Sequence, residues 1–283
     1  MAYHDLSLPG RKGLEIAMRA RESWPEGFVL TEELVGIYYA YVHRCEFPDP
    51  RQGTIYPQTF ATYLLSYAID TYEALLVLLP FGVFTATGTL LRSLFEASFS
   101  LAALRSDSSI MPDLYAASLD QVRLALRGAE FLESTCQNIS DFRPTGRHHC
   151  SACQALDEGK QEWAQRKEGR DPKNWHAMGL ERIAQIGRRT KLYESFYRTF
   201  CLCSHPSAHQ IEKNITDDGA GQKVLKAGID EAAIPSQLSN ASVCLIDCLL
   251  DHNFYMKQLD ESELVRLGEM KAEFNVLPRK GKT

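Results

Sequence analysis

Residues 74–104 constrain the fold more than any other part of the chain, because these 31 consecutive residues contain only two charged side chains. Apolar residues recur at helical spacing before and after Pro80-Phe81-Gly82, a sequence that interrupts a helix. The pattern therefore predicts two long apolar helices, at about 57–79 and 85–104. Such helices have to bury their apolar surface, so we expect them to form the central hairpin of a bundle.

The remaining chain is also helical in its periodicity, and no run alternates as a half-buried strand does. The sequence thus predicts an all-α fold, a multi-helix bundle around the buried apolar hairpin. Three parts are expected along the chain: an N-terminal helical extension at 1–50, the bundle domain at 51–267 and a C-terminal tail at 268–283.

Helix-capping and helix-breaking residues mark the ends of the other expected helices. A first helix is expected at 13–24, and a second at 31–44 with Thr31 as its N-cap. Later helices are expected at 176–186, 191–204 and 261–274, while Asp, Gly, Lys and Ala dominate the long loop expected from Pro206 to Pro235.

Composition places the chain among soluble globular proteins, with 45% hydrophobic and 24% charged residues among 283. The net charge of −5 argues against nucleic-acid binding by the whole surface. Charge is nevertheless uneven: residues 143–198 hold twelve Lys/Arg and seven Asp/Glu, a local balance of +5 that suits an anionic ligand or a solvated helix face. No secretory signal or membrane partner is indicated, so we expect a cytoplasmic protein with reduced cysteines.

An arginine and a histidine near residue 200 form the first candidate site. Arg198 and His205 are seven residues apart, or two helical turns, and so share a helix face. Pro206 follows and cannot continue the helix, so we expect the helix to end there. The pair could be a small phosphate-cleaving site or an ordinary helix cap.

The two charges of the apolar stretch, Arg92 and Glu96, form the second candidate. Because they are four residues apart on one helix, they can pair. The pair could fix the register of the bundle, or it could line a pocket in which Glu96 orients another side chain. Buried cations need an anionic partner, so we expect Glu96 within hydrogen-bonding reach of Arg198, His205 or Tyr197.

Metal and cofactor motifs are weak or absent. His149, Cys150 and Cys153 could supply half of a zinc site, but no second Cys-x-x-Cys exists. Cys244 and Cys248 lie on an apolar helix and are expected in the core. Gly-x-Ser-x-Gly, His-Glu-x-x-His and a phosphate-binding glycine-rich loop are missing, so we expect neither a metal nor a cofactor.

The run from Trp175-His-Ala-Met-Gly179 through Tyr193-Glu-Ser-Phe-Tyr197-Arg198 to His205-Pro206-Ser207 resembles the signature of a bacterial family, domain of unknown function 5677. Arg92-x-x-x-Glu96 resembles the other signature of this family. The resemblance spans about residues 57–260 and implies an all-helical fold without a settled activity. The chain departs from the family at Cys201, where a serine is expected.

The Arg198-x6-His205 spacing is also similar to the Arg-x4-6-His pattern of the HEPN superfamily of helical ribonucleases and nucleotide-binding proteins. This resemblance implies a homodimer in which two copies of the motif meet. It implies that Arg198 holds the scissile phosphate and His205 transfers protons without metal, with RNA or a nucleotide as the ligand. The supporting pocket would comprise Arg92, Glu96, Tyr193, Tyr197 and Ser204.

Three functions follow from these patterns. The first is a metal-independent endoribonuclease of the toxin or phage-defence type. The second is a helical module that binds a nucleotide, RNA or a protein at the same pocket without turnover. The third is a scaffold in which these side chains only satisfy one another.

Overall fold

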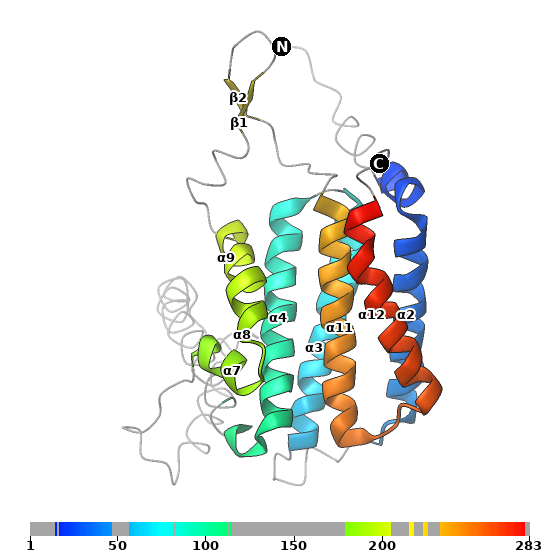
Figure 1. Cartoon of the computed structure of the whole chain (residues 1–283), viewed down its shortest axis with the longest axis vertical. Coiled ribbons are helices and arrows are strands. Elements are labelled where there is room, and N and C mark those ends of the chain that lie inside the picture. Colours follow the sequence, from blue (N-terminus) through cyan, green and yellow to red (C-terminus); the bar gives the residue numbers. More distant parts are fainter. Residues whose placement is uncertain are drawn as a thin grey trace, which may run out of the picture. The chain divides into compact units, whose positions relative to one another are not determined.

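A computed structural model of the chain describes residues 15, 17–46, 57–81, 83–111, 114, 179–204, 215–217, 223–225 and 233–280. Two compact units make up the chain, Met1–Ser108 with Leu180–Thr283 as the first and Ser109–Gly179 as the second. The first unit is a helical bundle, and the predicted all-α fold class is confirmed (Figure 1).

The described elements follow one another as α2 Pro25–Arg44, α3 Pro57–Leu78, the 3-10 turn η2 Leu79–Phe81, α4 Phe84–Ser106, η3 Ser108–Ile110, α7 Leu180–Ile186, α8 Thr190–Leu192, the π-turn η5 Tyr193–Tyr197, α9 Arg198–Ser204, β1 Ile215–Asp217, β2 Lys223–Leu225, α11 Ile234–Met256 and α12 Glu261–Lys280.

The predicted apolar hairpin is the centre of the bundle. Helices α3 and α4 pack against each other, and α11 packs against both (Figure 1). Burying one large aliphatic or aromatic side chain contributes roughly 1.5–3 kcal/mol, so this core supplies much of the driving force for folding. Its side chains with 0% exposure include Tyr72, Leu75, Leu91, Leu94, Phe99, Leu101, Leu104, Leu245 and Leu249.

Helix α2 starts earlier than predicted and belongs to the bundle. It begins at Pro25, a residue that suits the first helical position, after Trp24. The expected N-cap, Thr31, therefore lies inside the helix, where its hydroxyl donates to the Phe28 carbonyl. Helix α2 packs against α11 and α12, and Leu34 has 0% exposure. The predicted N-terminal extension is wrong for this helix, because its apolar face completes the core.

The predicted boundary at residue 268 is also wrong. Helix α12 runs through it to Lys280, because apolar residues continue at helical spacing past Phe274. Met270 and Phe274 have 0% exposure and Leu277 has 5%. Residues 268–277 therefore pack against the bundle as part of its core.

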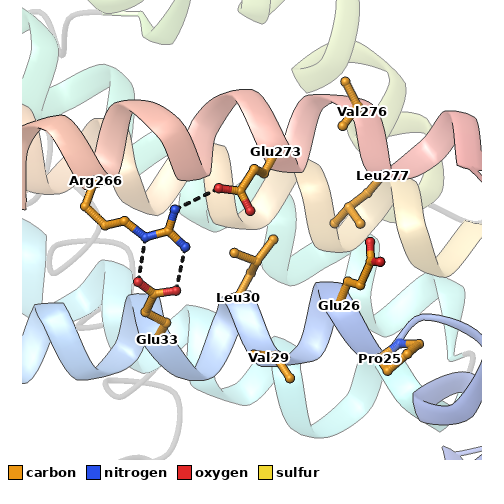
Figure 2. A pocket seen from close by; sticks show the side chains of 9 residues that line it. All are labelled: Pro25, Glu26, Val29, Leu30, Glu33, Arg266, Glu273, Val276 and Leu277. Atoms are coloured by element: carbon orange, nitrogen blue, oxygen red, sulfur yellow. Dashed lines mark hydrogen bonds and ion pairs between the residues drawn. The ribbon is translucent and has the colours of Figure 1, made fainter.

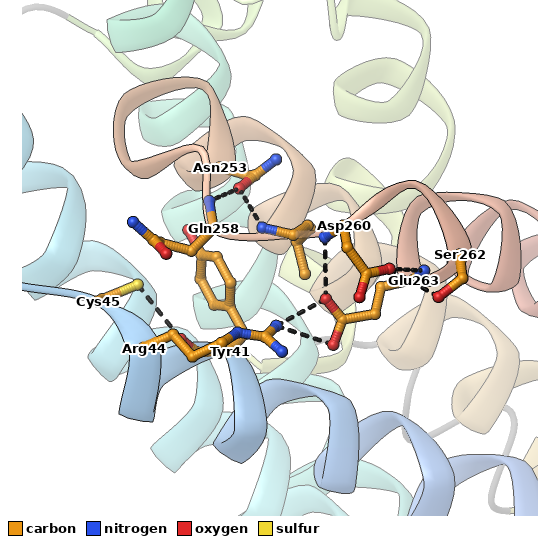
Figure 3. Close-up of polar contacts among 9 residues, drawn as sticks. Tyr41, Arg44, Cys45, Asn253, Gln258, Asp260, Ser262 and Glu263 are labelled. Atoms are coloured by element: carbon orange, nitrogen blue, oxygen red, sulfur yellow. Dashed lines mark hydrogen bonds and ion pairs between the residues drawn. The ribbon is translucent and has the colours of Figure 1, made fainter.

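The turn between α11 and α12 contains its own capping residues (Figure 3). Lys257 adopts the left-handed conformation with a φ of 53°, and the Asn253 side chain accepts two backbone N–H bonds beyond the helix. Asp260 and Glu263 then cap α12 reciprocally, each side chain accepting the other residue's backbone N–H. Arg44 binds both oxygens of Glu263 at 2.8 and 2.6 Å and so ties the end of α2 to this turn.

One antiparallel pair of strands interrupts the region predicted as a long loop. Strands β1 and β2 are three residues each, with Thr216 opposite Val224. Strands this short lack the alternation that sequence reading relies on, so they were not predicted.

Helix α3 together with η2 meets the length and hydropathy criteria of a membrane span among the described residues, with a mean hydropathy of 1.4. Core helices of soluble proteins meet the same criteria, so the composition is compatible with a soluble protein.

Candidate functional site

The candidate site is carried by the helix formed by α8, η5 and α9, within the range 191–204 predicted to be helical. Its π-turn was not predicted: the Arg198 N–H bonds the carbonyl of Tyr193, five residues earlier. In a π-turn, residues i+4 and i+5 both lie next to residue i. Tyr193 accordingly stacks on Tyr197, with ring centroids 5.2 Å apart, and Arg198 places its Cζ 5.4 Å from the Tyr193 ring.

Tyr197 joins this helix to the Arg92–Glu96 pair of α4. Its hydroxyl donates to Glu96 Oε1 at 2.7 Å, and Arg92 Nε donates to the same oxygen at 3.0 Å and to the Tyr197 hydroxyl at 3.2 Å. The Arg92 guanidinium also lies 5.5 Å from the Tyr197 ring centroid. The predicted contact between Glu96 and the later motif is thus confirmed, with Tyr197 as the partner.

This network is half-buried. The side chains of Arg92 and Glu96 are 31% and 37% exposed, whereas Tyr197 is 7% exposed. Burial, followed by the hydrogen bond to Glu96, raises the pKa of Tyr197, so the phenol stays protonated and acts as a donor. Burial alone would lower the pKa of Arg92, but the hydrogen bonds to Glu96 and Tyr197 raise this pKa on balance.

Aromatic side chains hold α9 against α4. Phe95 stacks on Phe196 and Phe200 with centroids 6.4 and 6.0 Å apart, and Phe99 meets Tyr197 edge-on at 5.9 Å. Phe196 remains 38% exposed, so the aromatic cluster continues to the protein surface beside Arg198.

Arg198 itself is largely exposed to solvent. Its side chain is 61% exposed, and Glu181 of α7 lies 4.0 Å from it, a separation at which exposed charges interact weakly. Glu96 therefore does not pair with Arg198. His205 and the side chain of Ser204 lie outside the described residues, and the described part of α9 ends at Ser204.

A tight turn sets the position of the site helix on α4. A Cβ at Gly187 would lie 2.9 Å from both Ala102 Cβ and the Ala103 nitrogen, so only glycine permits this approach. Arg188 follows in the left-handed region with a φ of 56°. The Arg189 carbonyl then accepts the backbone N–H of Tyr193 and starts the helix that carries the site.

The side chain of Arg189 enters a cluster of five charged groups. It donates to Asp247 and, at 3.0 Å, to Asp251, which lie one turn apart on α11 and are 4% and 3% exposed. Arg105 of α4 donates to Asp251 at 2.9 Å, and Lys271 of α12 donates to Asp247. Burial alone would lower the pKa of Arg189, but the two carboxylates raise it on balance.

This cluster was missed in the sequence, although its signal was present. Asp247 and Asp251 interrupt an apolar helix four residues apart, as Arg92 and Glu96 do in α4. Nothing local indicates that Arg189, 58 residues before Asp247, supplies the counter-charge. The cluster ties the turn before the site helix to the core helix α11.

His252 is a second buried polar group on α11, with 0% exposure. Its Nδ1 lies 2.6 Å from the Tyr41 hydroxyl and its Nε2 lies 3.0 Å from the Thr62 hydroxyl. The Thr62 hydroxyl already donates to the Gln58 carbonyl, so Nε2 carries the hydrogen and Nδ1 accepts from Tyr41. Burial lowers the pKa of His252 to about 4, which keeps the ring neutral.

A groove of ≈ 450 Å³ lies between α2 and α12 (Figure 2). Arg266 crosses it, binding both oxygens of Glu33 at 2.6 and 2.7 Å and Glu273 at 2.7 Å. Val29 and Val276 line it and are 62% and 44% exposed. None of the residues predicted for the candidate site lies in this groove.

Metal ligands do not gather in the described part of the chain, where no group of three His, Cys, Asp or Glu side chains could hold an ion. The weak zinc candidate at His149, Cys150 and Cys153 lies outside the described residues. Cys244 and Cys248 are buried in the core, as predicted.

Fold and site together define an all-α bundle protein with an Arg–Glu–Tyr network between a central helix and a π-bulged outer helix. The chain belongs to the family of unknown function DUF5677, whose profile matches residues 58–223. The match is shorter than the predicted span of 57–260 and ends before α11. No curated protein and no solved structure matches the chain.

Proposed function

We propose that this protein is a metal-independent endoribonuclease of the HEPN type, in which Arg198 binds the scissile phosphate and His205 transfers protons. The observation that carries the proposal is the placement of Arg198. Its guanidinium is 61% exposed, stacked on Tyr193 and paired only loosely with Glu181, so an incoming phosphate can displace the carboxylate at small cost.

The chemistry requires one proton acceptor and one proton donor. His205 removes the proton of the ribose 2′-hydroxyl, the 2′-oxygen attacks phosphorus, and the bond from phosphorus to the 5′-oxygen breaks. The departing 5′-oxygen takes a proton from a water molecule, leaving a 2′,3′-cyclic phosphate and a 5′-hydroxyl. Arg198 neutralises the charge that develops on the non-bridging oxygens. The HEPN resemblance adds a homodimer in which two such motifs meet.

Tyr193, Tyr197, Arg92 and Glu96 have supporting roles in this proposal. The network from Glu96 to Tyr197 holds the π-turn, and the π-turn holds Tyr193 beneath Arg198. Ser204 precedes His205 directly and serves as a hydrogen-bonding neighbour. A cytoplasmic location fits, because the buried Cys45, Cys244 and Cys248 are thiols rather than disulfides.

The test is cleavage of total RNA and transfer RNA by the purified protein in excess EDTA. Wild-type cleavage that is lost in His205→Ala and Arg198→Ala supports the proposal. The matched control is Lys191→Ala, which removes another exposed cation from the same helix and should leave cleavage unchanged. Wild-type protein without cleavage, or His205→Ala with full cleavage, would overturn it.

A non-catalytic RNA- or nucleotide-binding module is the second candidate. It is favoured by Arg198, which is 61% exposed and lies 5.4 Å from the centroid of the Tyr193 ring. Arginines and aromatic rings in this arrangement bind nucleic-acid backbones and bases without chemistry. Anisotropy of a labelled oligoribonucleotide distinguishes the two candidates, because binding that weakens in Arg198→Ala without any cleavage supports only this one.

A further inference from the structure

The charged cluster around α11 has its carboxylates inside and its cations outside. Asp247 and Asp251 are buried, whereas the side chains of Arg105, Lys271 and Arg189 are 48%, 36% and 19% exposed. Three cations against two carboxylates leave the cluster with one uncompensated positive charge. The surface above the two carboxylates is therefore cationic, although the whole chain carries a net charge of −5.

Arg188 adds a further positive charge beside this cluster. It directly precedes Arg189 in the chain and is exposed. Among the described residues, none forms a hydrogen bond or an ion pair with its side chain. Its φ of 56° lies in the left-handed region, which glycine adopts at a smaller cost than arginine. The turn thus holds an exposed cation at a position where the backbone by itself would favour glycine.

Phe254 of α11 supplies an aromatic surface next to these cations. The residue is 52% exposed, and the Cζ of Arg105 lies 5.7 Å from its ring centroid. Arg105 donates to Asp251 through Nη1 at 2.9 Å, and most of its five N–H donors remain for a ligand. Arg198 and Tyr193 form the same kind of pair at the candidate site, 5.4 Å apart. Arginine beside an accessible ring suits the phosphates and bases of a single-stranded nucleic acid.

The Arg188 turn and the candidate site lie at the two ends of one helix. Helices α7 and α9 both pack against α4, and the turn after α7 leads into the site helix, which begins at Thr190 (Figure 1). Arg198 follows Arg188 by ten residues, which corresponds to about 15 Å of helix. A strand that advances about 3.4 Å per nucleotide covers this distance in about four to five nucleotides.

We propose that Arg105, Arg188 and Phe254 form a second RNA-binding patch, in which the two arginines bind phosphates and Phe254 stacks on a base. The inference rests on the proposed function, because the strand is the one whose scissile phosphate lies at Arg198. The substrate class is single-stranded RNA. Bases of a single strand can leave their stack and lie on an aromatic side chain, whereas a duplex keeps them paired inside and offers Phe254 nothing to stack on.

Binding is measured as the anisotropy of a labelled 2′-O-methyl octauridylate added to the full-length protein. This strand has no free 2′-hydroxyl to attack phosphorus, so binding is measured separately from catalysis. We expect Arg188→Gly and Phe254→Ala each to raise the dissociation constant at least about fivefold. Glycine suits the left-handed backbone at residue 188, so Arg188→Gly should keep the wild-type circular dichroism. It should also reduce the slope of log Kd against log salt concentration by about 0.7, the contribution of one phosphate contact.

Arg21→Ala is the matched control. Arg21 is also an exposed arginine beside a phenylalanine, since its side chain is 61% exposed and its Cζ lies 5.2 Å from the Phe28 ring, but it is outside the patch. Its loss should leave the dissociation constant unchanged. Wild-type binding in both patch variants, an equal loss in Arg21→Ala, or a wild type that does not bind overturns the inference. The cleavage assay with Arg198→Ala decides the proposed function separately.

A strand of the same length built from abasic 2′-O-methyl units tests the base contact. Phe254→Ala should weaken binding of the octauridylate but not of the abasic strand. Arg188→Gly should weaken binding of both, because both strands carry phosphates. Equal weakening of the two strands by Phe254→Ala overturns the stacking role of Phe254. Tighter binding of a duplex of the same length than of the single strand overturns the assignment to single-stranded RNA.

Discussion

The Tyr197 hydroxyl donates a 2.7 Å hydrogen bond to Glu96, a residue 101 positions earlier in the chain. The bond crosses from the π-bulged outer helix to the central helix α4 and brings the Arg92–Glu96 pair into contact with the helix that carries Arg198. It therefore couples the position of the helix that carries Arg198 to the core of the bundle.

Removing this bond should loosen the outer helix without removing its ring contacts. Tyr197→Phe keeps the packing against Phe99 and the stack on Tyr193, but leaves Glu96 and Arg92 without the phenol. We expect a loss of about 1–2 kcal/mol in the free energy of unfolding, measured by urea denaturation. A variant as stable as the wild type would show that the hydroxyl bond is replaced by water at no cost.

Arg189 and Arg198 should differ sharply in their contributions to stability. Arg189→Ala removes one cation from each of two buried carboxylates, Asp247 and Asp251. We therefore expect the free energy of unfolding to fall by roughly 3–5 kcal/mol. Arg198→Ala removes an exposed side chain and should change stability by less than about 0.5 kcal/mol. Thermal unfolding of the two variants side by side checks the difference; equal losses would mean that Lys271 and Arg105 suffice for the carboxylates.

Two glycine substitutions should act in opposite directions. Gly187→Ala places a methyl group 2.9 Å from the backbone nitrogen of Ala103, which has to move, so we expect a loss of about 1–3 kcal/mol. Gly268→Ala, inside helix α12, meets nothing within 4 Å and should stabilise the protein by about 0.5–1 kcal/mol through lower entropy of the unfolded chain. Chemical denaturation of both variants provides the comparison, and a neutral Gly187→Ala would contradict the close approach to α4.

Acid should destabilise the protein partly through His252. In the unfolded chain this residue takes up a proton near its ordinary pKa of 6.5, but in the folded protein only near pH 4, because burial disfavours the charged ring. Between these values the unfolded state binds more protons, so stability present above pH 6.5 is lost as pH falls through that window. The full effect is about 3 kcal/mol.

His252→Gln isolates this contribution. Glutamine can accept from Tyr41 and donate to Thr62 as the neutral ring does, but it does not titrate. Unfolding free energies measured from pH 7.5 to 3.5 should therefore fall less steeply in the variant than in the wild type. Parallel curves for the two proteins would show that His252 is protonated normally in the folded state.

The fold was predictable where apolar residues recur over long distances. The hairpin of α3 and α4 was predicted close to its observed bounds, because Pro80 and Gly82 interrupt an otherwise continuous helical pattern. Errors arose where local signals compete: Thr31 is a good N-cap residue, but Pro25 starts the helix six residues earlier. The boundary predicted at 268 ignored a local signal, because Met270, Phe274 and Leu277 recur at helical spacing and are buried in the structure.

The candidate site was predictable in its composition and only partly in its arrangement. The sequence by itself determined that Arg92 and Glu96 share a face and that Glu96 requires a polar partner, because helical spacing and the cost of burying charge are local properties. The tertiary structure alone decided that Tyr197 is this partner, that Arg198 turns toward solvent, and that Arg189 serves Asp247 and Asp251. Those outcomes depend on how the π-turn and the Gly187 turn place one helix on another. Contacts between residues far apart in the sequence produce no periodic pattern from which they could be predicted.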